Sequence, residues 1–282
     1  MIFVQGAGVE TRSASRFLAE FFAKRGVAAL IYDKRGAGAS TGDWKRSSFE
    51  DLAGDVVAAV NYLKTRPEID PARVGVMGSS QGGWIAPITA ARVSGIRFVV
   101  VKSAACVTPE EQELARVEAQ MRASRNSPND IEQALTLYRN VIAYARSGEG
   151  WDKLSATLET ASQQKWYFFA RNIPKDWWFF DQVRLTFDHD PIPVLQRIHS
   201  PLLVIFGGQD SYGPPVRESL ARLVQALGGG GNQAVIQVFP NAGHDLRVEP
   251  GKGDAWDFSR FAPGYLESLA SWVRLQTEVG GR

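Results

Sequence analysis

The sequence predicts an α/β fold, in which a doubly wound, mostly parallel sheet carries an inserted helical cap. Short apolar runs that resemble buried strands alternate with amphipathic segments at helical spacing, which is the rhythm of parallel strands joined by helices. This rhythm stops between residues 107 and 195, where the pattern is helical and no convincing strand occurs. We therefore expect a core formed by residues 1–106 and 196–282 and a cap formed by residues 107–195.

The strands of the core are predicted from short runs that are apolar throughout, as is typical of strands buried on both faces of a sheet. The first run begins at Ile2, and the others cover residues 27–32, 74–77, 97–101, 201–206 and 234–239.

The helices are predicted from apolar residues that recur every three or four positions. In the core they cover residues 13–24, 49–63, 217–227 and 263–279, with one more after Gly82. Residues 47–50 resemble a capping box, Pro67 ends the helix that follows, and four glycines at 228–231 stop a later one. In the cap we expect helices at residues 109–125, at residues 127–146 and from about Trp151 onwards.

A G-x-S-x-G motif, Gly78-Ser79-Ser80-Gln81-Gly82, stands between a predicted strand and an apolar segment that can be helical. A serine hydroxyl is a weak nucleophile until a strained strand-to-helix turn and a neighbouring base activate it. Glycines two positions before and after the serine let the backbone pass close to its neighbours, where a Cβ would crowd the turn. We therefore predict Ser80 as a nucleophile and regard Ser79 as structural.

An acid and a base follow in the order that this turn requires. Asp210 comes after the strand at residues 201–206, and His244 lies in the loop that leaves the strand at residues 234–239. Because the carboxyl ends of parallel strands meet at one edge of a sheet, we expect both side chains near Ser80. The chain order Ser80, Asp210, His244 differs from the orders of the chymotrypsin and subtilisin groups.

Other residues compete for these two roles. Asp210 is favoured as the acid because it ends a strand, but three aspartates that follow the cap remain alternatives: Asp181, Asp188 and Asp190. His244 is favoured by position over His189, in a polar run at the exit of the cap, and over His199, on the approach to a strand. Asp245 is too close to His244 in sequence to orient it.

A fourth motif completes the pattern. Asp33-Lys34-Arg35-Gly36-Ala37-Gly38-Ala39-Ser40 matches a D-x-R-G-x-G-x-S loop, and with the other motifs it makes the chain resemble the serine α/β-hydrolases, in the branch that holds esterases, dienelactone-hydrolase-like enzymes and serine aminopeptidase-like enzymes. The resemblance covers about residues 2–106 and 195–279. It implies the α/β-hydrolase fold and two backbone N–H groups, those of Gln81 and Ala7, as donors to an oxyanion. We regard Asp33 and Arg35 as residues that shape their own loop.

The amino terminus departs from this family. The run from Ile2 to Gly8 already resembles its third strand and oxyanion loop, so we expect either a short natural chain or a fragment. Without the first two strands, residues 27–32 would form an apolar edge, which invites pairing. We therefore expect another subunit of a homo-oligomer, or a helical lid, to cover that edge. We expect a cytoplasmic protein as given, or an exported one if an upstream segment is missing.

Composition limits the partners. Thirty-two basic and 30 acidic residues leave a net charge of +2, which provides no basic stripe for nucleic acid and favours neutral or mildly polar substrates. No run approaches the length of a membrane span. A single cysteine, Cys106, rules out an intrachain disulfide. We expect no cofactor and no metal, because neither the glycine-rich stretches nor the His, Cys and carboxylate residues have the required spacing.

Aromatic residues are concentrated in the second half of the predicted cap, at residues 166–169 and 177–180. Such density above a catalytic serine fits the wall of an acyl or aryl pocket, and the residues we select are Trp166, Phe169, Trp177 and Trp178. A small cap also needs large side chains for its own core, so both interpretations remain open.

The resemblance implies acyl transfer, because relatives that dehalogenate or open epoxides have an aspartate in place of Ser80. Cleavage of small carboxylic esters through an acyl-enzyme is the first expectation. A serine peptidase on short peptides is the alternative, with cap carboxylates available to hold a substrate amine: Glu110, Glu111 and Glu113. Thioester or lactone cleavage and a catalytically dead binding module complete the alternatives.

Overall fold

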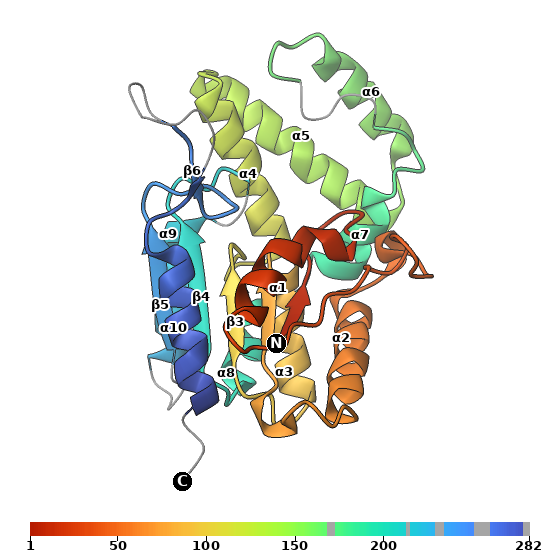
Figure 1. Cartoon of the computed structure of the whole chain (residues 1–282). Coiled ribbons are helices and arrows are strands. Elements are labelled where there is room, and N and C mark those ends of the chain that lie inside the picture. Colours follow the sequence, from red (N-terminus) through yellow and green to blue (C-terminus); the bar gives the residue numbers. More distant parts are fainter. Residues whose placement is uncertain (168–172, 213–214, 229–233, 251–259, 279–282) are drawn as a thin grey trace.

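The computed structural model describes residues 1–167, 173–212, 215–228, 234–250 and 260–278 (Figure 1). Among these residues, no helix is both long and apolar enough to cross a membrane. The predicted fold class is confirmed, because a parallel sheet lies between layers of helices and a group of helices stands above it.

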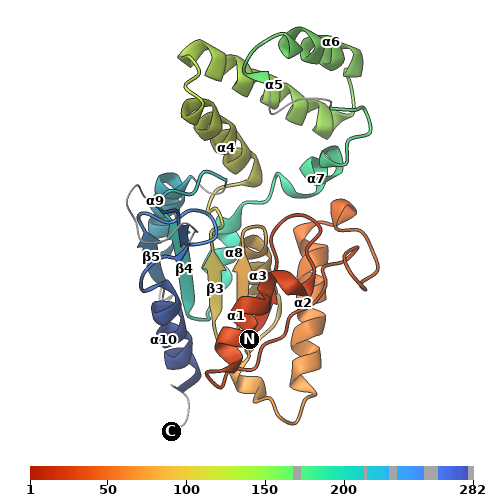
Figure 2. The same cartoon turned by 45° about the horizontal axis from the view of Figure 1, so that its top comes forward.

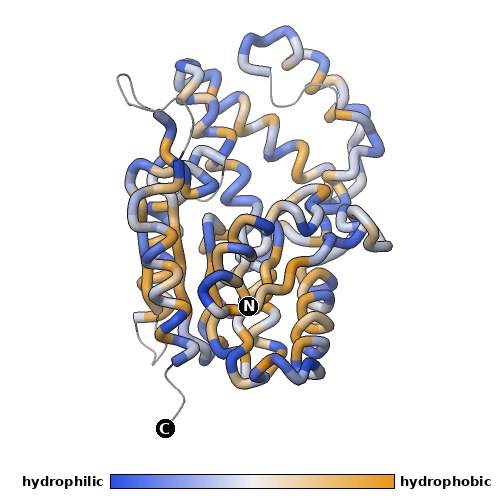
Figure 3. Tube along the Cα trace, viewed as in Figure 1, coloured by the Kyte–Doolittle hydropathy of each residue, from blue (hydrophilic) through white to orange (hydrophobic). Residues whose placement is uncertain are grey.

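The main sheet has the strand order β1-β2-β3-β4-β5, and every neighbouring pair is parallel. Its strands are β1 (Ile2–Val4), β2 (Val76–Ser79), β3 (Val99–Lys102), β4 (Leu202–Gly207) and β5 (Ala234–Phe239). A small antiparallel pair, β6 (Arg247–Val248) and β7 (Arg260–Phe261), follows at the carboxyl edge. Strands β3 and β4 are buried along their whole length. Figure 3 shows that the sheet is made largely of hydrophobic residues.

Helices cover both faces of this sheet. One face packs against α2 (Phe49–Lys64), α3 (Gly82–Arg92), α8 (Pro191–Arg197) and α9 (Val216–Leu227), and the other against α1 (Arg16–Ala23) and α10 (Tyr265–Glu278). Side chains alternate between the two faces along each strand. Val76 therefore packs on the face covered by α2 and α3, and its neighbour Met77 packs on the face covered by α1 and α10. Short 3₁₀ turns precede α1, α2 and β2: Arg12–Ser15, Trp44–Arg46 and Pro71–Arg73.

Residues inserted between β3 and α8 form helices that stand above the carboxyl ends of the strands (Figure 2). They are α4 (Pro109–Ala123), α5 (Pro128–Ser147), α6 (Trp151–Ser162) and α7 (Phe179–Thr186). These helices share a hydrophobic cluster of their own, which includes Met121, Val141 and Val183. Helix α8, most of which the sequence assigned to the cap, instead packs against the core through Val194 and Leu195.

A buried amide and an aromatic ring are among the contacts that join the inserted residues to the core. The Gln182 amide on α7 is buried and donates to the carbonyl oxygens of Trp44, Lys45 and Ser47 at 3.2, 2.7 and 3.3 Å. His189, just before α8, packs edge-on against Phe49 with ring centroids 5.3 Å apart.

Two local predictions need correction. Residues 27–32 do not form a strand, because only Leu30 makes a bridge, to Ile2 of β1. The segment therefore lies at the edge beside β1 without a regular ladder, and its coverage by another subunit stays a prediction. The capping box of α2 uses Ser48 and Asp51, one residue later than the Ser47–Glu50 pairing that the sequence suggested.

We predict that His189 makes the fold acid-sensitive. Burial lowers the pKa of its imidazole to about 4, and in the described part of the chain its Nε2 has no hydrogen-bond partner. An unfolded histidine has a pKa of about 6.5, so the unfolded state binds more protons between these values. The free energy of unfolding should therefore fall as the pH drops from about 6.5 to 4, by at most about 3 kcal/mol from this group.

Urea unfolding between pH 4 and 7 measures this dependence. His189→Phe, which keeps a ring against Phe49, should reduce the slope, whereas His199→Phe at an exposed position should leave it unchanged. If the free energy of unfolding of His189→Phe depends on pH as steeply as that of the unmodified chain, His189 does not cause the acid sensitivity.

Candidate active site

The G-x-S-x-G segment forms a sharp turn between β2 and α3. Ser80 has a φ of 54°, in the left-handed region that a residue with a side chain rarely adopts. Its backbone N–H donates to the Lys102 carbonyl at 2.9 Å, and its carbonyl accepts from Gly83 at 2.8 Å. The strained conformation is therefore held on one side by β3 and on the other by the first turn of α3.

The glycines of the turn are required by close backbone contacts. A Cβ on Gly82 would lie less than 3.0 Å from the carbonyl oxygens of Val4 and Gln5, and a Cβ on Gly78 would meet the Gly82 carbonyl at similarly short range. Only hydrogen fits at either position. The elbow is thus packed directly onto the end of β1.

Asp210 and His244 lie together at the same edge of the sheet. His244 Nδ1 is 2.7 Å from Asp210 Oδ2, and the Asp210 carboxylate is fully buried while the imidazole is 23% exposed. Asp210 Oδ1 also accepts from the Tyr212 N–H at 3.0 Å. A buried carboxylate on Nδ1 leaves Nε2 of His244 as the ring nitrogen available to a nucleophile.

The loops that carry this pair are joined to each other. Gln209 N–H donates to the Ala242 carbonyl at 2.9 Å, and Gly208 N–H donates to the Phe239 carbonyl at 2.9 Å. Ser103, at the end of β3, donates its hydroxyl to the His244 carbonyl at 2.6 Å. The exits of β3, β4 and β5 therefore fix the histidine loop together.

The competing acids are engaged elsewhere. Each pairs with an arginine: Asp181 with Arg184 at 2.5 Å, Asp188 with Arg146 at 2.6 Å and Asp190 with Arg222 at 3.1 Å. The structure places Asp210, and none of these three, beside His244.

The loop after β1 brings a second group of backbone atoms to Ser80. A Cβ on Gly6 would be 3.3 Å from Ser80 Cβ, so this loop lies against the serine. Within the described part of the chain, the N–H groups of Ala7 and Gln81 donate to no other group. Both are therefore free to bind an oxygen that gains negative charge.

A cavity of about 560 Å³ opens beside Ser80 and His244. It lies over the α1 and α10 face of the sheet, and its apolar walls come from β1, β2, α1, β7 and α10: Phe3, Met77, Phe17, Leu18, Phe261 and Tyr265. Polar atoms enter it from Glu10, Lys102, Asp245 and Arg247. The cavity lining thus combines apolar side chains with several charged ones.

Comparison with known proteins identifies the family. A family model described as the alpha/beta hydrolase family matches residues 1–253. The chain belongs to this family. Among curated proteins it is similar to an uncharacterized 31.7 kDa protein in the traX-finO intergenic region of Escherichia coli, with 23% identity over 204 residues that span 70% of this chain and 67% of that protein.

Solved structures agree on the fold. The esterase Pf2001 of Pyrococcus furiosus superposes with a TM-score of 0.56 and 18% identity, covering 97% of this chain and 81% of that one. A monoacylglycerol lipase of Paleococcus ferrophilus gives a TM-score of 0.57 and 18% identity, covering 98% and 93%. At this identity the likeness shows the fold alone.

The selected aromatic residues of this hydrolase do not line the Ser80 cavity. Trp166 is 4% exposed inside the cluster of the inserted helices, and Trp177 packs against that same cluster. Trp178 contacts Trp44 edge-on at 5.2 Å. Phe169 lies outside the described residues. None of these three described residues lines the Ser80 cavity, because their rings pack within the cluster of the inserted helices or against Trp44, and contact between them and a substrate stays a prediction.

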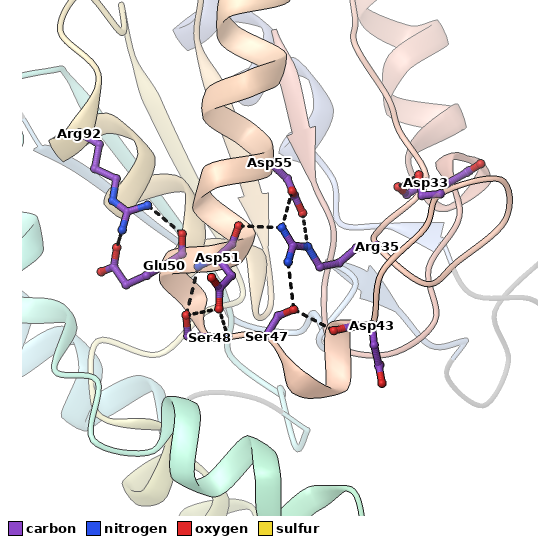
Figure 4. Close-up of polar contacts among 10 residues, drawn as sticks. Asp33, Arg35, Asp43, Ser47, Ser48, Glu50, Asp51, Asp55 and Arg92 are labelled. Atoms are coloured by element: carbon purple, nitrogen blue, oxygen red, sulfur yellow. Dashed lines mark hydrogen bonds and ion pairs between the residues drawn. The ribbon is translucent and has the colours of Figure 1, made fainter.

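The D-x-R-G loop behaves as a structural element (Figure 4). Asp33 and Arg35 do not pair with each other: Asp33 binds Arg12 at 2.7 Å, and Arg35 binds Asp55 of α2 at 2.6 Å. Hydrogen bonds from Arg12 and from the Ala39 N–H hold the pKa of the Asp33 carboxyl well below its usual range. The two ion pairs anchor the start of the loop, and the Ala39 N–H and the Ser40 hydroxyl tie its far end back to Asp33, in keeping with a structural role.

Three further side chains near Ser80 were not found by sequence reasoning. Lys34, within the D-x-R-G loop, and Lys102, at the end of β3, are 3% and 6% exposed. Glu10 accepts a 3.1 Å hydrogen bond from the Gly6 N–H. A charge directly after the Val99–Val101 run was a visible signal for Lys102, because residues at the carboxyl end of a buried parallel strand face the site.

Other candidate chemistry is not supported. Burial raises the pKa of the Cys106 thiol to about 12, which keeps it protonated. In the part of the chain that the structure describes, no group of three or more His, Cys, Asp or Glu side chains could hold a metal ion.

We predict that Gly82→Ala strongly destabilises the hydrolase, because the new methyl group would overlap the end of β1. Overpacking of this kind typically costs about 1–3 kcal/mol. Gly54→Ala is a matched control in the exposed face of α2, where a Cβ meets no atom within 4 Å. There, alanine should add about 0.5–1 kcal/mol of stability. Urea unfolding measures both, and equal midpoints for the two variants would contradict the close contact.

Proposed function

We propose that this chain is a serine hydrolase that cleaves small carboxylic esters through an acyl-enzyme. The observation that carries the proposal is the arrangement of Ser80 on a strained elbow beside the His244–Asp210 pair, with the serine and the imidazole facing one cavity. An ordinary surface serine requires neither the strain nor the pair.

In the proposed reaction, Nε2 of His244 accepts the Ser80 proton while the hydroxyl oxygen attacks the ester carbonyl. Asp210 holds the imidazole by Nδ1 and stabilises its protonated form. The imidazolium then gives its proton to the departing alcohol. His244 then removes a proton from a water molecule, which attacks the acyl-enzyme carbonyl. The bond to Ser80 breaks, the serine oxygen takes the proton from His244, and the carboxylic acid is released.

The carbonyl oxygen becomes negative during each attack. The free N–H groups of Ala7 and Gln81 are proposed to receive it, and losing one such donor typically raises the barrier by about 2.7–4 kcal/mol. The Gly6–Ala7 loop lies against Ser80 and is part of the cavity wall, which supports this assignment.

Ester substrates are favoured over peptides. The cap carboxylates that a peptidase would need for a substrate amine are occupied: Glu110 by Arg146, Glu111 by Arg222 and Glu113 by Arg116. Apolar side chains of α1 and α10 offer room for a short acyl chain. Two solved structures with a similar fold are an esterase and a monoacylglycerol lipase, which also favours an ester substrate.

We predict turnover of nitrophenyl esters with a preference for short acyl chains. Initial rates of hydrolysis of the acetate, butyrate, octanoate and laurate esters measure the acyl-chain preference. Aminoacyl nitroanilides, assayed in parallel, test for peptidase activity. Ser80→Ala should abolish ester turnover because the acyl group then has no acceptor.

Ser79→Ala is the matched control, since it alters the neighbouring hydroxyl of the same turn and should retain most of the rate. Turnover that survives Ser80→Ala would refute the nucleophile. Faster cleavage of the nitroanilides than of the esters would replace the ester assignment with a peptidase.

A further inference from the structure

Lys34 touches both halves of the proposed oxyanion site. Its Nζ donates to the Gly6 carbonyl at 2.7 Å and to Gln81 Oε1 at 2.6 Å, and it lies 4.8 Å from the centre of the Trp44 ring. One ammonium group therefore bridges the loop after β1 and the residue that follows Ser80. Burying a lysine is costly unless its charge is compensated, so this position requires an explanation.

The geometry of a peptide group supplies one. The Gly6 carbonyl and the Ala7 N–H belong to a single planar peptide, in which a trans arrangement points them in opposite directions. An ammonium that holds the carbonyl therefore turns the Ala7 N–H away from Lys34. Ala7 and Ser80 line the same cavity, whereas Lys34 is not part of its lining.

The same glycine is held at its other end. The Gly6 N–H donates to Glu10 Oε2 at 3.1 Å, and the Lys34 N–H donates to the Glu10 carbonyl at 3.1 Å. Glycine has the widest backbone freedom of any residue. Without these hydrogen bonds, the peptide between Gly6 and Ala7 could rotate and the Ala7 N–H would change its direction. Contacts on both sides of Gly6 remove that freedom.

We propose that Lys34 is a positioning residue that orients and polarises the Ala7 backbone donor for the oxyanion formed at Ser80, and that holds this donor beside Gln81 through the Gln81 side chain. The proposal rests on the ester hydrolysis proposed above. A charged donor on a carbonyl strengthens the hydrogen bond that the N–H of the same peptide makes, because hydrogen-bonded groups polarise one another. Lys34 then acts through the Gly6–Ala7 peptide without touching the substrate, and its bond to the Gln81 side chain fixes the ammonium in place.

This role has a pH signature. Burial lowers the pKa of the Lys34 ammonium to about 8, and the Glu10 carboxylate opposes part of that shift. The other groups facing the ammonium are neutral: the Gly6 carbonyl, the Gln81 amide and the Trp44 ring. The ammonium is therefore charged below about pH 8 and loses its charge above it, so kcat should fall as the pH rises through this range.

Variants separate positioning from mere packing. Lys34→Met keeps the aliphatic stem and removes the donors, so kcat should fall by about 10- to 1,000-fold with KM nearly unchanged, the upper figure matching loss of a whole oxyanion donor. Lys34→Arg stays charged at every accessible pH and should lack the alkaline decline. Glu10→Gln keeps an acceptor for the Gly6 N–H but should move the decline to lower pH, because the carboxylate no longer raises the pKa of Lys34.

A second measurement does not depend on turnover. The backbone amide resonance of Ala7 in ¹⁵N-labelled wild-type protein should titrate with a midpoint near pH 8, and this titration should vanish in Lys34→Met. Absence of ester turnover with an intact Ala7 titration would overturn the proposed function and leave the Lys34 contact standing. Melting temperatures of all variants identify any that fail to fold.

Two results would overturn the proposal. The first is ester turnover by folded Lys34→Met at the wild-type kcat. The second is an Ala7 resonance that does not change between pH 6 and 10. An alkaline decline that persists unchanged in both Lys34→Arg and Glu10→Gln would assign that decline to another group.

Discussion

The close approach of backbone to backbone at the elbow is the constraint on which the rest of the site depends. Gly82 presses the first turn of α3 onto the carbonyl oxygens at the end of β1, and Gly78 presses onto Gly82 in turn. This contact forces Ser80 into the left-handed region and brings the loop after Val4 against it. Ser80 and the N–H groups of Ala7 and Gln81 are therefore placed by the same contact between backbone segments.

Charge burial is the second organising theme. Asp210 is fully buried, and it is balanced by the imidazole and by a backbone N–H. Lys34 is balanced by a carbonyl and an amide oxygen. Charged groups that are fixed by such partners do not need to reorganise when a reaction develops charge beside them. The same arrangement carries a desolvation cost, which the surrounding parallel sheet and its apolar helices offset.

The fold, the strained turn at Ser80 and the pairing of Asp210 with His244 could be predicted, because chain order, strand ends and glycine spacing can be read directly from the sequence. Residues 27–32 show the limit of apolar runs, since a strand also needs a partner, and only Leu30 meets one on the short β1. The packing of Trp166, Trp177 and Trp178 away from the Ser80 cavity could not be predicted, because the density of aromatic residues does not say which face of a helix they occupy. Lys34 was missed because a loop lysine can reach in many directions, and only the folded backbone shows that it turns inward.

The inserted helices have their own hydrophobic cluster, and their contacts with the core include the Gln182 amide, the Trp178 ring and the Glu111 carboxylate. The residues that line the Ser80 cavity come instead from the core. The inserted helices and the cavity lining therefore belong to separate parts of the chain. Laboratory evolution or domain exchange could replace the inserted helices while the apolar lining from β1, β2, α1 and α10 is inherited unaltered.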